Sequence, residues 1–234
     1  MKKLINIQLN QDILKIIALL TMTLDHIGYI LTPSFETSLR LIGRISFPIF
    51  VFLLVFNLNQ KDLFKKYLTR LIIFAIITSL ALGPLKYILK NLLPLNIFWS
   101  LLLGTTAIYI IKKINTDLKN NKSRFIIIAY ILSICATLSI LTDYEIYGFL
   151  YILNFYYWFK TKNKIFAIIT LTLSFFVNLH ISIPASIISC LTTFILLLPK
   201  SRSKKTKRFL KPWWLFYAYY PIHLAILYII RIYF

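Results

Sequence analysis

The sequence predicts an all-α, polytopic integral membrane protein, a helical bundle of about nine transmembrane helices, and two observations support this fold class. First, 59% of the 234 residues are hydrophobic and 16% are aromatic, whereas an average soluble domain is about 45–50% apolar. Second, the apolar residues gather in long runs without two-residue alternation, which is typical of lipid-solvated helices and not of a barrel. Because a bilayer cannot hydrogen-bond open backbone, each such run must be helical.

Nine apolar segments follow one another along the chain, and a crossing helix needs roughly 17–25 residues. The first is too long for a signal peptide and lacks a small-residue cleavage site, so we interpret it as a retained helix. The sixth and seventh are short, which leaves both eight and nine crossings open. We see no linker, repeat or low-complexity stretch, and therefore predict a single transmembrane domain over residues 1–234. The predicted spans are 13–31, 39–58, 67–82, 92–111, 125–142, 144–159, 165–179, 181–198 and 213–234.

Most of the positive charge lies in short segments between the apolar runs. The chain carries 27 Lys and Arg against 7 Asp and Glu, a net charge of +20. The N-terminus and the connections at 59–66, 112–124, 160–164 and 199–212 hold 20 of the 27 basic residues. The positive-inside rule places the N-terminus and these connections in the cytoplasm. Charge in such loops sets topology and attracts anionic lipids, so we expect membrane lipids as partners and no nucleic acid.

The first apolar segment contains Lys15, Asp25 and His26. Ionisable groups inside a bilayer are costly, so each is a functional candidate. Lys15 and His26 are 11 residues apart, which puts them on one helical stripe, roughly 16 Å apart along the axis. Asp25 and His26 are neighbours and point about 100° apart, so they are not a ready-made dyad. His26 suits a general base because imidazole titrates near neutral pH. Lys15 either faces an anionic substrate or extends to the headgroups.

The second segment opens with two arginines, Arg40 and Arg44, which are four residues apart and share one helical face. They lie at a depth similar to that of Asp25, so an ion pair between Arg44 and Asp25 is expected. Such a pair serves either structure or substrate binding.

The third segment begins with Tyr67 and Arg70 near the predicted cytoplasmic edge. Arg70 and Lys15 together could hold an anionic cosubstrate such as a nucleotide phosphate. The alternative is that both side chains only reach the headgroups.

The last segment contains Tyr217, Tyr220, Pro221 and His223. Pro221 has no backbone N–H, so the carbonyl of Tyr217 loses its helical partner. A freed carbonyl, tyrosine hydroxyls and an imidazole at mid-membrane depth predict a polar pocket. The alternative is a simple kink with one satisfied histidine. The three histidines are far apart in the sequence, so we expect no metal.

These polar motifs, taken in order, resemble those of the TraX family over nearly the whole chain. The named member of that family is a conjugative-pilus protein that acetylates the amino terminus of pilin and is taken to use acetyl-CoA. More distantly, the spacing of Lys15 and His26 resembles the first-helix motif of membrane O-acyltransferases that modify surface glycans and lipids. The matching segments are 15–28, 40–50, 66–71, Asn96–Phe98 with Gly104, Tyr147–Gly148 and 216–223.

The resemblance implies an integral membrane acetyl- or acyltransferase of the bacterial inner membrane, with acetyl-CoA as the acyl donor. The acceptor would be an amine or hydroxyl on a pilin-like protein, a surface glycan or a lipid. His26 would be the base, Lys15 and Arg70 would face the CoA phosphates, and further residues would line the chamber. We therefore predict catalytic roles for Asp25, His26 and His223, and substrate or donor binding by Lys15, Arg40, Arg44, Tyr67, Arg70, Tyr217 and Tyr220.

Two other classes of function would use the same residues. A transporter or flippase would employ the buried ions as a proton or substrate relay, although no inverted repeat is visible. A structural membrane subunit would use the polar residues to join helices. The sequence leaves the acceptor, the acyl group and the oligomeric state open.

Overall fold

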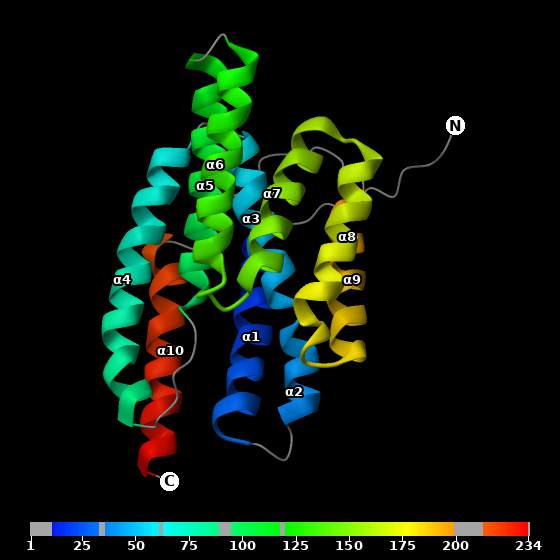
Figure 1. Ribbon diagram of the computed structural model, residues 1–234. Helices are drawn as coiled ribbons and strands as arrows, with labels where there is room; N and C mark the ends of the chain where they lie inside the picture. Colours follow the sequence, from blue (N-terminus) through cyan, green and yellow to red (C-terminus); the bar gives the residue numbers. More distant parts are fainter. Residues whose placement is uncertain are drawn as a thin grey trace. The chain divides into compact units, whose positions relative to one another are not determined.

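The computed structural model describes residues 11–32, 36–60, 63–88, 95–117, 120–198 and 213–233. Within these ranges the chain is helical, without a named strand, and only Leu95 and Thr142 form an isolated bridge. The predicted all-α class is therefore confirmed (Figure 1). The helices are α1 Gln11–Ile30, α2 Glu36–Gly43, α3 Ser46–Gln60, α4 Phe64–Ile88, α5 Ile97–Asp117, α6 Asn121–Ser139, α7 Glu145–Thr161, α8 Lys164–Leu179, α9 Ile183–Leu197 and α10 Trp213–Tyr233.

The helices follow the predicted segments, with one difference in the second. The single helix predicted over 39–58 is divided into α2 and α3 by a turn at Arg44 and Ile45. Pro48 has no N–H to bond the carbonyl of Arg44, which favours a new helix start at this point. The Ser46 hydroxyl donates to the carbonyl of Gly43 at 2.7 Å and stabilises the turn. The described part of the chain therefore has ten helices, because α2 and α3 together replace the one helix predicted over 39–58.

In the described residues, six helical stretches are long and apolar enough to cross a membrane, which indicates a multi-pass membrane protein. Two more helices, α8 and α9, are apolar but shorter, and α7 has 17 residues. The basic connection predicted at 199–212 and the basic N-terminus lie outside the described residues. The six candidate spans are Gln11–Ile30, Ser38–Asn59, Phe64–Leu85, Ile97–Asp117, Asn121–Ser139 and Trp214–Tyr233.

The chain divides into two compact units, and the prediction of a single domain stays a prediction. The terminal unit comprises Met1–Leu53 and Asn178–Phe234, and the central unit comprises Leu54–Val177. In the terminal unit, α1 packs against α2 and α10, and α2 contacts α9. Figure 1 shows α1 and α10 running in the same direction. This parallel arrangement brings the first and last apolar segments of the chain together.

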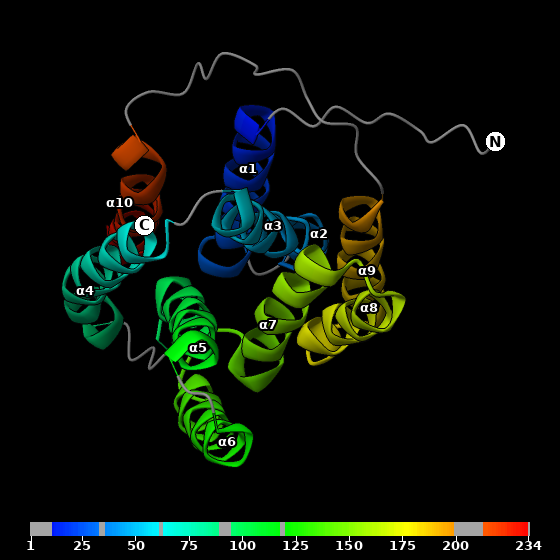
Figure 2. The same ribbon diagram turned by 90° about the horizontal axis from the view of Figure 1, so that it is seen from above.

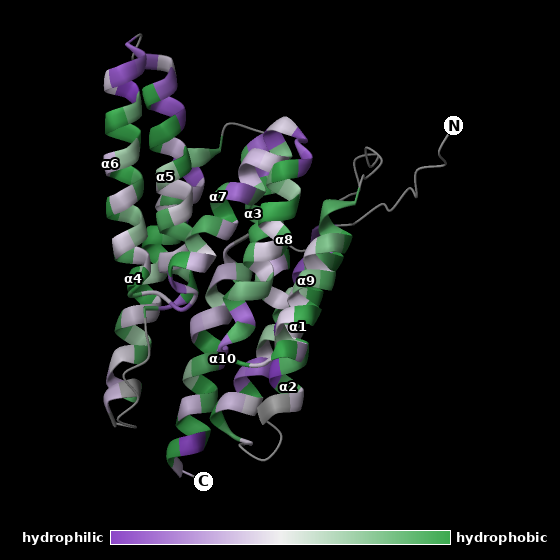
Figure 3. Cartoon of the chain, turned by 45° about the vertical axis from the view of Figure 1, so that its right-hand side comes forward, coloured by the Kyte–Doolittle hydropathy of each residue, from purple (hydrophilic) through white to green (hydrophobic). Residues whose placement is uncertain are grey.

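The central unit is built around α5. It contacts α4, α6 and α7, and Figure 2 shows it among these three helices. Gly104 of α5 permits the close approach of α7, because a Cβ there would lie 2.7 Å from Ile152 Cγ2. Figure 3 shows hydrophilic residues gathered where α5 leads into α6 and where α7 leads into α8. The outward face of α6 carries large apolar side chains such as Phe125 and Tyr130, as expected of a lipid-facing helix.

Candidate active site

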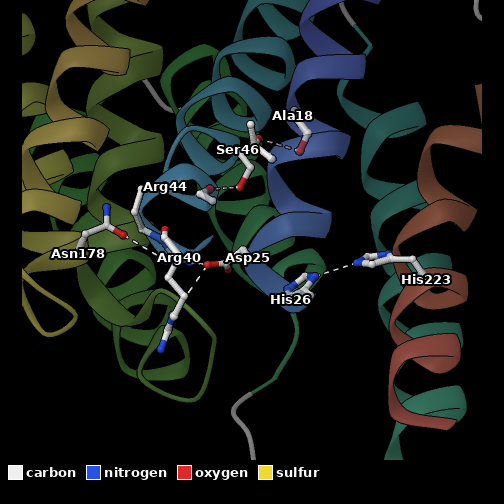
Figure 4. A network of polar contacts seen from close by, with 10 residues as sticks. Ala18, Asp25, His26, Arg40, Arg44, Ser46, Asn178 and His223 are labelled. Carbon is white, nitrogen blue, oxygen red and sulfur yellow. Dashed lines mark hydrogen bonds and ion pairs between the residues drawn. The ribbon is translucent and has the colours of Figure 1, made fainter. Parts of the chain in front are cut away.

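Two neighbouring residues of α1 reach towards different helices of the terminal unit. Figure 4 shows Asp25 turned towards Arg40 and Arg44, and His26 turned towards His223 on α10. Adjacent helical residues diverge by about 100°, so one turn of α1 serves two separate polar clusters. This divergence was expected from the sequence.

The first cluster is a pair of histidines. His26 Nδ1 and His223 Nε2 are 2.8 Å apart, and His223 Nδ1 lies 2.8 Å from the carbonyl oxygen of Tyr219. The rings of the two histidines stack with centroids 5.0 Å apart. Tyr220 stands edge-on to both, with its ring centroid 5.9 Å from that of His26 and 5.7 Å from that of His223.

The carbonyl at the end of this chain determines where the protons lie. A carbonyl oxygen only accepts, so His223 Nδ1 must carry a proton and donate it to Tyr219. In neutral His223 the other nitrogen, Nε2, is then an acceptor, and His26 Nδ1 must donate to it. Neutral His26 therefore carries its proton on Nδ1 and a lone pair on Nε2. This tautomer is the one that a general base requires at Nε2.

Additional polar contacts join α1 and α10 on either side of the histidines. The Thr23 and Tyr219 hydroxyls are 2.7 Å apart, and Arg231 Nη1 donates to the carbonyl of Ile30 at 3.0 Å. The contacts of Thr23, His26 and Ile30 advance along α10 in the same order. They fix the two helices parallel and in register.

The second cluster is an ion network around Asp25. The predicted ion pair between Arg44 and Asp25 is present, and Arg40 Nε lies 3.8 Å from Asp25 Oδ1. Arg44 also donates to the carbonyl of Arg40 at 3.1 Å and to Asn178 Oδ1 at 3.3 Å. The Arg44 side chain is only 6% exposed and that of Asp25 only 15%. A guanidinium buried to this degree requires a carboxylate and further acceptors to offset its desolvation.

A glycine makes the ion network possible. A Cβ added to Gly43 would lie under 3.0 Å from the Asp25 side chain, so only glycine lets the end of α2 approach α1 this closely. Arg40 also lies over the ring of Tyr29, whose centroid is 5.3 Å from the guanidinium carbon. The network therefore depends on shape as well as charge.

The residues predicted to bind a donor come from both units, Lys15 from α1 and Tyr67 and Arg70 from α4. Lys15 Nζ is paired with Asp12 Oδ1 at 2.8 Å and lies 6.0 Å from the ring centroid of Phe216. Asp12 is 1% exposed, so the charge of Lys15 has a buried partner on its own helix. Tyr67 and Arg70 are half-buried on α4, which belongs to the central unit.

The two predicted tyrosines of α10 differ in their place relative to the histidines. Tyr220 contacts both imidazole rings. Tyr217 is buried, and its ring packs edge-on against Phe216 with centroids 5.7 Å apart. The structure thus brings Tyr220 to the histidine pair.

Sequence reasoning missed three members of these clusters, Thr23, Asn178 and Tyr219. Thr23 precedes His26 by three residues and Tyr219 precedes His223 by four. Residues at these spacings share a helical face, so this signal could have identified both. Asn178 has no such signal, because it reaches Arg44 from a distant part of the chain. Among the described residues, no three His, Cys, Asp or Glu side chains are grouped to hold a metal ion.

Comparisons with known proteins agree with the sequence motifs. The TraX protein family model matches residues 10–231. A stretch of 99 residues is 39% identical to part of an uncharacterized protein of Rickettsia prowazekii (strain Madrid E), covering 42% of this chain and 36% of that protein. The chain thus matches only about a third of the length of this relative. No solved structure matches. The family match extends over nearly the whole chain and includes both polar clusters, so the chain belongs to the TraX family.

Proposed function

We propose that this protein is an integral membrane acyltransferase that moves an acetyl or related acyl group from acetyl-CoA to an amine or hydroxyl acceptor. The observation that carries the proposal is the hydrogen-bonded chain from His26 through His223 to the Tyr219 carbonyl. It leaves the lone pair of His26 on Nε2, as a general base requires. Membership of the TraX family supports acyl transfer as the reaction class.

In the proposed reaction, the nitrogen or oxygen of the acceptor attacks the thioester carbonyl while His26 Nε2 takes the proton from that nitrogen or oxygen. The carbon–sulfur bond then breaks, and the proton on His26 passes to the departing CoA thiolate. His223 holds the Nδ1–H of the transient imidazolium throughout, as the orienting member of a catalytic triad does. Both nitrogens of His223 are engaged, so Arg44 and Tyr220 are the better candidates to stabilise the oxyanion.

The proposed donor site uses a cation predicted from the sequence. Lys15 would face the phosphates of acetyl-CoA from the cytoplasmic side, and the sequence-based expectation that Tyr67 and Arg70 bind the donor stays a prediction. Lys15 would then exchange its contact with Asp12 for a phosphate. The acceptor would be a pilin-like protein, a surface glycan or a lipid. Arg40 would contribute to binding the acceptor rather than the acyl donor.

The parallel contacts between α1 and α10 support nine crossings of the bacterial inner membrane. If the first and last crossing helices point the same way, the number of crossings is odd. The six long candidate spans alone would give an even number, whereas adding α7, α8 and α9 gives nine. The N-terminus is then cytoplasmic and the end of α10 lies outside.

Fusions test this topology directly. Alkaline phosphatase fused after α10 should be active and green fluorescent protein at the same place dark, with the opposite result at the N-terminus. Both ends on one side of the membrane would mean an even number of crossings and would contradict the parallel pairing.

The activity is tested with the purified chain in nanodiscs. Labelled acetyl-CoA is added with a cell-envelope fraction as the source of acceptors, and release of free CoA and incorporation of label are measured. We expect saturable binding of acetyl-CoA, and we expect His26→Gln to lower transfer roughly 10²–10⁴-fold with binding retained. Ser133→Ala, on the exposed face of α6, is the matched control and should behave as wild type.

Two outcomes would reject the proposal. Well-folded wild type that neither binds acetyl-CoA nor transfers label would favour a transporter or flippase that uses the same buried ions. Transfer unaffected by His26→Gln would remove the histidine from the reaction.

A further inference from the structure

Tyr219 makes contacts with three different parts, two of them with His223 and the third with Thr23 on α1. Its carbonyl oxygen accepts from His223 Nδ1 at 2.8 Å, and its ring stacks on the His223 imidazole with centroids 5.0 Å apart at an interplanar angle of 18°. Its hydroxyl lies 2.7 Å from the hydroxyl of Thr23 on α1. One residue of α10 therefore orients His223 and at the same time binds the helix that carries His26.

The hydrogen bond between Thr23 and Tyr219 has a defined direction. The Thr23 hydroxyl donates its single hydrogen to the carbonyl of Leu19 at 2.8 Å. It can therefore only accept from Tyr219. Tyr219 donates from α10 to α1, and His26 donates from α1 to α10, so the two helices exchange bonds one turn apart.

We propose that Thr23 and Tyr219 are a positioning pair that holds His26 in its reactive tautomer. This inference rests on the proposed function, in which His26 Nε2 is the base. The bonds of Thr23 to Tyr219 and of His26 to His223 lie one turn apart and together fix the rotation of both helices beside the histidines, whereas the bond from Arg231 to Ile30 lies further along the helices. Without the Tyr219 hydroxyl bond, His223 Nε2 moves away from His26 Nδ1, and neutral His26 places its proton on either nitrogen. The molecules with the proton on Nε2 cannot accept one from the acceptor.

The spacing of the four residues supports a shared function rather than a chance contact. Thr23 and His26 are three residues apart on α1, and Tyr219 and His223 are four apart on α10. Each pair therefore lies on one face of its helix, directed at the partner helix. A bond that served only to join the helices would not require the same residue to accept from His223 and stack on its ring.

Two variants test the pair, with two controls that separate the hydroxyl bond from general loss of a polar group. Tyr219→Phe and Thr23→Val each remove the bond, and Thr23→Ser keeps it. Thr21→Val removes a hydroxyl of the same helix that, within the described residues, bonds only to carbonyls of its own helix, those of Ile17 and Ala18. Transfer rates are measured with the KM for acetyl-CoA. The tautomer of His26 is read from nitrogen-15 spectra of histidine-labelled protein in nanodiscs.

We expect Tyr219→Phe and Thr23→Val to lower kcat about tenfold to a hundredfold with KM unchanged, because misplaced catalytic groups cost rates of this order. The spectrum should change from one His26 tautomer to a mixture. The double variant should be no slower than either single variant, because the two substitutions remove the same hydrogen bond. Thr23→Ser and Thr21→Val should match wild type in rate and spectrum.

The readouts keep failure of this inference apart from failure of the proposed function. If His26→Gln abolishes transfer but Tyr219→Phe and Thr23→Val keep the wild-type kcat and tautomer, the positioning pair is wrong and the base stands. Additive losses in the double variant would also reject it. If no transfer occurs in wild type but the tautomer still shifts on loss of either hydroxyl, the coupling is real and the reaction is wrong.

Discussion

Two pairs of helices, α1–α10 in the terminal unit and α4–α5 in the central unit, are each joined by polar side chains, but the chemistry of these side chains differs. Between α4 and α5, Asn96 donates to the Ala75 carbonyl at 3.3 Å and to Ser79 Oγ at 3.2 Å. Trp99 Nε1 donates to the same hydroxyl at 3.1 Å. All of these groups are neutral at any working pH. The α1–α10 pair instead places two titratable imidazoles face to face.

The difference separates polar groups that hold helices together from polar groups that perform chemistry. A neutral hydrogen bond between membrane helices contributes about 0.6 kcal/mol on average and up to about 1.7. Such a bond stabilises the packing of two helices, and its loss costs little stability. An ionisable group at the same depth costs several kcal/mol when its partner is absent. Side chains of that kind are therefore expected where function requires them, as in the terminal unit.

The largest effect is expected for Arg44→Met in the terminal unit. Loss of this guanidinium leaves Asp25 largely buried beside Arg40 alone, and breaking a buried ion pair in this way costs about 3–5 kcal/mol. Unfolding of the purified protein by increasing denaturing detergent measures the change. The double variant Asp25→Asn/Arg44→Met should recover most of the stability, because the buried carboxylate is neutralised together with the loss of its guanidinium, but should not recover transfer. If Arg44→Met and the double variant were equally stable, the contributions of Asp25 and Arg44 to stability would not be coupled.

Substitutions of two glycines, one in each unit, are expected to have the next largest effects on stability. Gly104→Ala in the central unit should destabilise by about 1–3 kcal/mol, because the added methyl overlaps Ile152. Ile152→Ala should relieve the overlap in a double variant. Transfer per folded molecule should be unchanged.

Gly43→Ala in the terminal unit should cost a similar amount of stability but also abolish transfer. Its methyl group is directed at the Asp25 side chain, so it displaces the carboxylate from Arg44. The measurement is transfer normalised to folded protein. If Gly43→Ala and Gly104→Ala reduce stability alike and both leave transfer intact, Asp25 has no part in the reaction.

Much of this arrangement could be predicted from the sequence, because it depends on periodicity and on local chemistry. The apolar runs predicted the helical segments apart from the division between α2 and α3, and the position of Arg40 and Arg44 predicted the ion pair between Arg44 and Asp25. The divergence of Asp25 and His26 follows from helical geometry alone.

The parts that could not be predicted depend on long-range register. Nothing in the apolar segment of α10 states that His223 meets His26 rather than another polar group, since 197 residues separate them. The break between α2 and α3 also depended on a competition. The apolar run favoured one helix, whereas Pro48 and the bond from Ser46 to Gly43 favoured a turn. Asn178 was missed because its contact with Arg44 likewise joins distant parts of the chain.

A smaller effect is expected for Asn96→Ala in the central unit. Asn96 is 4% exposed and bonds to both α4 and the start of its own helix, where its Oδ1 accepts from the Phe98 amide at 3.1 Å. Its loss should cost about 1–2 kcal/mol and leave transfer per folded molecule unchanged. The detergent unfolding midpoint and the transfer assay together check this. A loss of transfer per folded molecule without a loss of stability would instead give Asn96 a role in the reaction.

The smallest effect is expected for Thr78→Val, which tests whether every buried polar group in the central unit contributes. Thr78 is fully buried, and within the described residues its hydroxyl has no hydrogen-bond partner. A buried hydroxyl without a partner is a cost to folding, so replacing it with a methyl group should leave stability unchanged or raise it by up to about 1 kcal/mol. Thr105→Val is the matched comparison, because Thr105 is equally buried but donates to the Leu101 carbonyl at 2.7 Å. If Thr78→Val lowered stability more than Thr105→Val, the Thr78 hydroxyl would have a hydrogen-bond partner in the membrane. The polar groups of the central unit would then do more than join its helices.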